Sequence, residues 1–159
     1  SYTTPDILIL GKALSGGAYP VSAVLANDHI MEVIQHGQHG STYGGNPLAM
    51  SAAIATLQAM ESENIYENVQ QIAPQMQTLL EALQSEFPKI IKEVRGIGLL
   101  WGLELQKQVN ASEILHIAAK NGLLITKAAG GTVLRLCPAL IFNQVAELQE
   151  KLQKTFLQL

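Results

Sequence analysis

Lys12 lies at the end of a predicted strand, a position from which a side chain can act as a nucleophile in many α/β proteins. It follows the apolar run of residues 7–10 and lies among small residues, in the segment 11–17. Open α/β sheets bind ligands at the carboxyl ends of their strands, and partial burial there lowers the pKa of an ammonium group. The neutral amine that results can attack a carbonyl carbon and form an imine. Lys12 is therefore a candidate catalytic residue, and a surface lysine at a strand end is the alternative interpretation.

Residues 39–47 combine hydroxyl side chains with a glycine pair directly before a predicted helix. Asn46 is a favoured residue for capping a helix N-terminus, and proline is favoured at the first helical position, which Pro47 would occupy. Free backbone N–H groups and the positive end of the helix dipole attract an anion such as phosphate. The segment therefore predicts an anion site, and a polar loop that only caps the helix is the alternative.

Arg135 is one of two arginines in the chain, and it lies in the otherwise apolar segment 133–138. Its guanidinium group keeps its charge at any relevant pH, so among apolar neighbours it needs a partner. A substrate carboxylate held by two parallel hydrogen bonds would serve, and so would an internal aspartate or glutamate. The sequence leaves both open. The other arginine, Arg95, is interpreted as a structural or turn residue.

The remaining reactive residue types give weaker signals. The four histidines show no metal-ligand spacing, so no metal site is predicted. Cys137 precedes Pro138 in a predicted strand with no evident base beside it. It is interpreted as a buried, unreactive thiol.

Helices and strands that could position these residues follow from the apolar patterns and turn signals. Strands are expected at residues 7–10, 21–26, 93–96, 99–105, 123–126 and 132–136, and helices at 29–34, 46–60, 65–83, 111–121 and from 143 onward. The continuous apolar run 7–10 indicates a strand buried on both faces, as in a parallel sheet. Pro74 predicts a kink or a restart within the long helix. A piece of parallel α/β sheet is thus expected before the segment 60–88, and a compact α+β unit after it.

The composition excludes several classes of protein. Of the 159 residues, 48% are hydrophobic and only 14% are charged, so the chain is not disordered. A net charge of −3 disfavours nucleic acid and anionic membranes as partners, and no apolar run reaches the roughly 20 residues of a membrane span. The single cysteine fits a reducing compartment, which predicts a cytoplasmic location or, in a eukaryote, the mitochondrial matrix. Scarce charge also suggests that part of the surface is an interface.

Four motifs resemble the class III pyridoxal-phosphate aminotransferases, which have the α/β fold type I. They are residues 9–24 (ILGKALSGGAYPVSAV), 39–49 (HGSTYGGNPLA), 94–100 (VRGIGLL) and 134–140 (LRLCPAL). The resemblance covers essentially the whole chain. It implies that residues 1–60 form the C-terminal part of the large, cofactor-binding domain, that 61–88 form a connecting helix, and that 89–159 form the small α+β domain.

The resemblance also implies roles for individual residues. Lys12 matches the lysine that binds pyridoxal phosphate covalently and moves the proton during transfer. Thr42, with Ser41 beside it, matches the residue whose hydroxyl reaches the cofactor phosphate of the neighbouring subunit, so the active site would be shared across a homodimer. Arg135 matches the small-domain arginine that binds a substrate carboxylate.

Chains of this family are more than twice as long and carry further cofactor-binding motifs ahead of the lysine. None of those motifs occurs here, so the chain is expected to be a C-terminal segment that is inactive without the remainder.

The motifs around Lys12 and Thr42 are most similar to the ornithine branch of the family, and residues 129–135 are more similar to the acetylornithine branch. The expected reaction moves the δ-amino group of ornithine to 2-oxoglutarate, giving glutamate 5-semialdehyde and glutamate. Acetylornithine is the alternative substrate. A non-catalytic interaction module is the alternative function, from a different class of protein.

Overall fold

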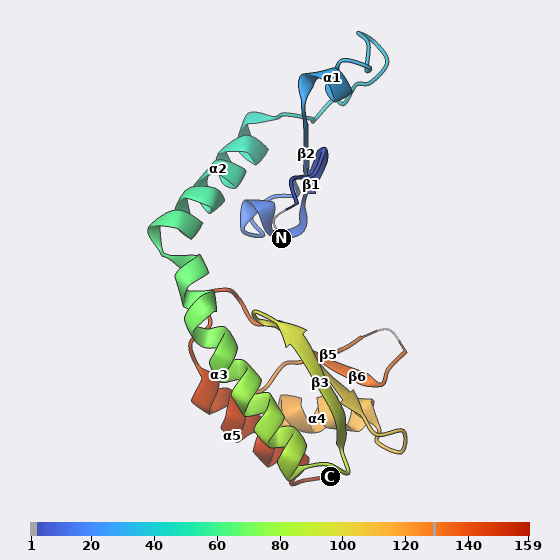
Figure 1. Ribbon diagram of the computed structural model, residues 1–159, viewed down its shortest axis with the longest axis vertical. Coiled ribbons are helices and arrows are strands. Elements are labelled where there is room, and N and C mark those ends of the chain that lie inside the picture. The colour runs from blue at the N-terminus through green and yellow to red at the C-terminus, as the bar shows by residue number, and fades with distance from the viewer. Residues whose placement is uncertain (1–2, 129) are drawn as a thin grey trace. The chain divides into compact units, whose positions relative to one another are not determined.

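The computed structural model describes residues 3–128 and 130–159. The chain divides into two compact units, one ending at Glu63 and the other beginning at Asn64 (Figure 1). The first unit contains β1 (Ile7–Leu10), the short 3-10 helix η1 (Lys12–Ser15), β2 (Ala23–Ala26), α1 (Asp28–Met31) and α2 (Pro47–Ser62). The second contains α3 (Ile65–Glu86), β3 (Ile91–Ile97), β4 (Leu100–Leu105), α4 (Ala111–Lys120), β5 (Thr126–Lys127), β6 (Val133–Leu136) and α5 (Val145–Phe156).

Strand β1 forms as predicted, but the neighbour that it has among the described residues is antiparallel rather than parallel. It pairs antiparallel with β2, with Ile7 opposite Ala26 and Leu10 opposite Ala23. The loop after η1 brings the chain back beside β1, which makes this pairing possible. Within the described residues its side chains are largely exposed, and Ile9 is 73% exposed. The apolar run therefore indicated a strand correctly but not its neighbours.

Helix α2 begins as its sequence predicts. Asn46 is the N-cap, and its side-chain oxygen accepts a hydrogen bond of 2.9 Å from the backbone N–H of Ala49. Pro47 occupies the first turn, where its missing N–H costs no hydrogen bond. The helix ends at Ser62, which matches the predicted break. Its alanine-rich body is not closely packed within the unit, since Ala49 is its one buried residue.

The loop that carries Lys12 is fixed against α2 at Gly16. This residue ends η1 with a left-handed φ of 64°, a conformation that glycine adopts without steric cost. A Cβ at this position would lie 3.1 Å from the Thr56 hydroxyl oxygen of α2. Glycine therefore allows both the turn and the close approach of the loop to the helix.

The second unit is a sheet with helices packed against one face (Figure 1). Its strands run antiparallel in the order β3-β4-β6-β5. Successive strand residues point to opposite faces, so on β4 Trp101, Leu103 and Leu105 are buried while Gly102 and Glu104 are not. The buried face meets the apolar stripe of α3, whose buried residues are Ile65, Ile72, Met76, Leu79, Leu80 and Leu83.

Two further expectations about helices are corrected. Of the kink or restart predicted at Pro74, the restart is not found, because Pro74 lies exposed within one continuous helix α3 whose buried stripe on either side packs into the same core. Helix α5 begins at Val145, two residues after the predicted start at residue 143, and no side chain caps it. None of the helices described is both long and apolar enough to cross a membrane.

Candidate active site

Lys12 has an unusual backbone conformation. Its φ is 54°, in the left-handed region, and Asn64 is the one other non-glycine residue with positive φ among those described. Such conformations are disfavoured for side chains with a Cβ and cluster at functional sites. Lys12 is exposed in this chain, so no described residue provides the partial burial that the sequence predicted. The lysine is therefore placed at the end of β1 as predicted, but other protein would have to desolvate it.

The turn after Lys12 is held from within by Ser15. This side chain is buried, its hydroxyl donates to the carbonyl oxygen of Tyr19, and its oxygen accepts from the N–H of Tyr19 at 3.2 Å. Both hydrogen bonds join Ser15 to the backbone of Tyr19 and so hold the chain in a turn directly after η1. The serine thus fixes the path of the chain between Lys12 and β2.

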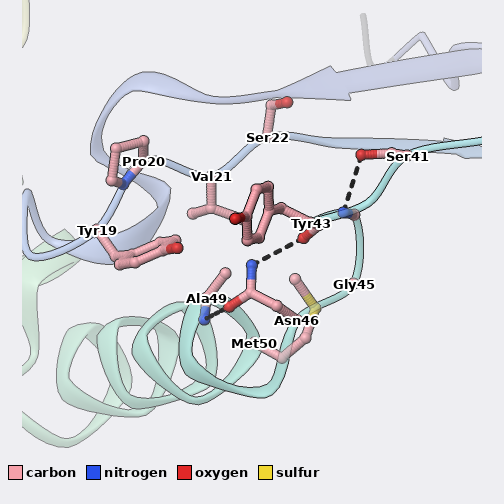
Figure 2. A pocket seen from close by; sticks show the side chains of 11 residues that line it. Tyr19, Pro20, Val21, Ser22, Ser41, Tyr43, Gly45, Asn46, Ala49 and Met50 are labelled. Atoms are coloured by element: carbon pink, nitrogen blue, oxygen red, sulfur yellow. Dashed lines mark hydrogen bonds between the residues drawn. The ribbon is translucent and has the colours of Figure 1, made fainter.

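A pocket of about 610 Å³ opens beside the first turn of α2. Figure 2 shows Tyr19 and Val21 on one side of it, and Tyr43 and Asn46 on the other. Asn46 joins the loop to the helix, because its amide also donates to the Tyr43 carbonyl oxygen at 2.8 Å. The pocket combines aromatic walls with the polar end of a helix.

Ser41 and Thr42 lie in the loop that leads into this helix. Ser41 lines the pocket, and its hydroxyl oxygen accepts a hydrogen bond of 2.9 Å from the N–H of Gly44. Thr42 is exposed and is not among the lining residues. Both hydroxyls remain able to donate a proton to an anion. The predicted phosphate ligands are therefore accessible, although only one of them faces the pocket.

Arg135 lies on β6 of the second unit, on the sheet face opposite the core. It lines a shallow groove of about 500 Å³ together with Arg95, Leu100, Gly102 and Val133. Its Nε donates a hydrogen bond of 3.2 Å to the hydroxyl oxygen of Thr126 on β5. Among the described residues no carboxylate pairs with it. Of the two partners left open by the sequence, an internal acid is therefore not found within this part of the chain.

Arg95 is a structural residue, as interpreted, but within a strand rather than a turn. Its Nη1 lies 2.7 Å from Oε2 of Glu104 on β4, and Lys92 Nζ lies 2.6 Å from Oε1 of the same carboxylate. Hydrogen bonds from Lys92 and Arg95 hold the pKa of Glu104 below its ordinary value. The same contacts raise the pKa values of Lys92 and Arg95. One carboxylate is thus shared between two cations on the outer face of the sheet.

The interpretation of Cys137 as a buried thiol is wrong. It is exposed, because it directly follows β6 and takes the outward position in the alternation that buries Leu134 and Leu136. The described residues contain no group of three or more metal-ligating side chains. Sequence reasoning missed Thr126, whose contact with Arg135 depends on strand register, and Tyr43, whose ring contributes to the pocket wall.

The comparisons with known proteins agree over nearly the whole chain. Residues 2–156 match the model of the aminotransferase class-III family. "Ornithine aminotransferase, mitochondrial" of Drosophila melanogaster is 46% identical over 156 residues, which are 96% of this chain and 35% of that protein. Ornithine aminotransferase of Plasmodium falciparum is 44% identical over 95% of this chain and 37% of that protein. The chain thus spans about a third of the length of these curated relatives.

Solved structures show the same relationship. Acetylornithine aminotransferase from Elizabethkingia anophelis matches with a TM-score of 0.92 and 41% identity, covering 99% of this chain and 40% of that one. Ornithine delta-aminotransferase of Plasmodium falciparum matches with a TM-score of 0.87 and 40% identity, covering 98% and 41%. The predicted fold class, the fold type I α/β transferases, is therefore confirmed. This chain belongs to the class III aminotransferases.

Proposed function

We propose that this chain is the C-terminal part of an ornithine δ-aminotransferase that moves the δ-amino group of ornithine to 2-oxoglutarate. Residues 1–60 would complete its large domain, 61–88 would form the connecting helix and 89–159 the small domain. The observation that carries the proposal is the 46% identity to an ornithine aminotransferase over 156 residues. Because the chain spans about a third of that relative, we expect activity from the longer protein and none from this segment alone.

The residues present fit pyridoxal phosphate, the cofactor of this family. Lys12 offers an exposed amine at a strand end, which suits the aldehyde of the cofactor. When bound, the cofactor supplies an electron sink for the charge left on the substrate carbon. The Lys12 Nζ would then carry the proton to and from the carbon that bears the transferred amino group. The unusual φ of Lys12 supports this role, since strain of this kind is stored at functional sites.

The phosphate would be bound by the loop before α2. Ser41 and Thr42 are exposed hydroxyl residues, and the helix that follows directs its positive end toward the loop. We propose that these two residues serve the cofactor of a neighbouring subunit, so that the site is complete only in a homodimer. The exposed apolar side chains of the first unit support such an assembly.

Arg135 would bind a carboxylate of the amino acid or the 2-oxo acid. Its guanidinium lines an open groove and, among the described residues, is paired with no acid. A planar guanidinium binds a carboxylate through two parallel hydrogen bonds. This arrangement would orient the substrate without taking part in bond breaking.

Acetylornithine is the second candidate substrate. The high TM-score of the Elizabethkingia anophelis acetylornithine aminotransferase favours it. For location we propose a reducing compartment inside the cell, and the mitochondrial name of the Drosophila melanogaster relative makes the matrix one such place.

A coupled assay of the full-length protein that carries this chain would separate the two substrates. We expect a higher kcat/KM with ornithine than with N-acetylornithine, with 2-oxoglutarate as acceptor. A preference for the acetylated substrate would assign the protein to the other branch. Lack of transfer with either substrate would favour an interaction module instead.

Lys12→Ala tests the proposed cofactor site directly. In the full-length protein we expect the visible absorption band of bound pyridoxal phosphate to disappear, and activity to fall by at least about 10³-fold. Lys107→Ala is the matched control, because Lys107 is also exposed and follows a strand. A band that persists unchanged in Lys12→Ala would contradict the proposed role.

A further inference from the structure

Arg135 has two different neighbours on its face of the sheet. Thr126 of β5 is paired directly with it on one side, and Gly102 of β4 on the other. Glycine contributes no side chain, so nothing from β4 fills the space beside the guanidinium there. Among the described residues, the side chain directly opposite Arg135 that can hold the guanidinium is therefore Thr126.

The contact with Thr126 decides which nitrogens of Arg135 remain free. Nε donates to the Thr126 hydroxyl oxygen at 3.2 Å. A carboxylate can bind a guanidinium through Nε and one terminal nitrogen, or through the two terminal nitrogens. With Nε engaged by Thr126, the arrangement that remains for a carboxylate is the one through the two terminal nitrogens.

Glu104 is the acid nearest in register that could neutralise Arg135. It lies two residues from Gly102 along β4, which makes it a diagonal neighbour of Arg135. Diagonal neighbours lie about 7–8 Å apart, within reach of long side chains. Both of its oxygens are already occupied, at 2.6 Å by Lys92 and at 2.7 Å by Arg95. Within the part of the chain that the structure describes, Glu104 is therefore not available to Arg135.

We propose that Thr126 is the positioning residue for Arg135, holding its Nε so that the two terminal nitrogens bind one substrate carboxylate. In the same proposal, Lys92 and Arg95 bind the carboxylate of Glu104 and so keep it from pairing with Arg135. This inference rests on the proposed carboxylate-binding role of Arg135. It adds Thr126 as a positioning residue and Glu104 as an internal carboxylate that could compete with the substrate for Arg135. Both lie on the outer face of the sheet. Thr126 touches neither the reacting atoms nor the cofactor in this assignment.

Thr126→Val and Thr126→Ser in the full-length protein test the positioning role. For Thr126→Val we expect KM for 2-oxoglutarate to rise about three- to tenfold, the loss of one hydrogen bond, with kcat within about twofold. Thr126→Ser keeps the hydroxyl and should retain the wild-type KM. Thr132→Val is the matched control, because Thr132 is exposed just before β6. An unchanged KM in Thr126→Val, or an equal rise in Thr132→Val, overturns the inference.

The competitor is tested by releasing Glu104. Lys92→Met/Arg95→Met should raise KM for 2-oxoglutarate, because the carboxylate of Glu104 then loses both of its cations and can turn to Arg135. Adding Glu104→Gln to this variant should restore KM. A loss caused only by damage to the sheet would not be restored by Glu104→Gln, and that result overturns the competitor role.

Arg135→Lys separates this inference from the proposed function. If Arg135→Lys leaves KM unchanged, the proposed carboxylate-binding role fails, and the inference fails with it. If Arg135→Lys raises KM while Thr126→Val does not, only the inference fails. A wild-type protein without transaminase activity overturns both.

Discussion

Lys12 and Arg135 carry the proposed chemistry, and each is set up by its immediate neighbours. Lys12 adopts a left-handed φ of 54°, a conformation that costs of order 1 kcal/mol or more outside glycine. Among the described residues no acid binds the terminal nitrogens of Arg135, since Thr126 engages Nε and Glu104 is held by Lys92 and Arg95. Lys12 thus differs from an ordinary surface lysine in its backbone conformation, and Arg135 differs from an ordinary surface arginine in its partners. Both side chains are exposed.

Glu104→Gln should make the thermal stability of the chain less dependent on pH. The pKa of Glu104 is lowered in the folded state from its ordinary 4.5, so the ionised carboxylate stabilises the fold above pH 4.5. This contribution is lost as pH falls through the lowered pKa. We expect a wild-type Tm slightly above that of Glu104→Gln from pH 5 to 8, and a smaller gap near pH 3.

Glu150→Gln is the control for this comparison, because Glu150 is an exposed glutamate on α5. Equal Tm differences at pH 3 and pH 7 for Glu104→Gln would show that the ion pairs with Lys92 and Arg95 add nothing to stability. Exposed pairs contribute little individually, so the effect is expected to be small and to decrease with added salt.

At the scale of elements, helix α2 connects the proposed phosphate loop to the body of the first unit. Asn46 joins the two, accepting from Ala49 and donating to the Tyr43 carbonyl oxygen. Gly16 brings the Lys12 loop against the same helix at Thr56. The position of α2 therefore influences both predicted cofactor contacts of the unit.

Asn46→Ala should loosen the first turn of α2. Loss of an N-cap costs about 1 kcal/mol, so we expect hydrogen exchange at the Ala49 amide to accelerate about fivefold. Asn27→Ala is a matched control, because Asn27 precedes α1 without making a side-chain capping bond. Comparable acceleration in both variants, each measured in its own helix, would argue against a capping role for Asn46.

At the scale of the whole chain, apolar side chains are exposed mainly along the first unit. Those with large exposed fractions on β1, β2 and α2 are Ile7, Leu8, Ile9, Val24, Leu25, Leu48, Met50, Ile54, Leu57 and Met60. Exposed apolar surface of this extent is typical of interaction sites. It fits the proposal that this unit packs against the remainder of a longer protein and a second subunit.

The isolated chain should therefore self-associate. Light scattering should show oligomers at low micromolar concentration, and Ile54→Lys together with Leu57→Lys should reduce them, because both side chains are more than half exposed on α2. Leu124→Lys is the control, since Leu124 is 89% exposed but belongs to the second unit. A monomeric wild-type chain would contradict the expectation.

Much of the fold could be predicted from local sequence. The Asn46–Pro47 pair marked the start of α2, and the stripe around Met76 marked the buried face of α3. These signals depend on hydrogen bonds and periodicity within a few residues. The candidate site residues also came from local motifs, and their roles remain predictions.

The sequence by itself determined the family, the positions of most helices and strands, and which residue types could carry the chemistry. Only the tertiary structure decided the antiparallel setting of β1, the exposure of Cys137 and the partners of Arg135. The physical reason is that strand register and neighbour identity depend on contacts between distant segments. A shift of one residue in the β5–β6 pairing would turn Thr126 to the other face of the sheet, and no local pattern fixes that choice.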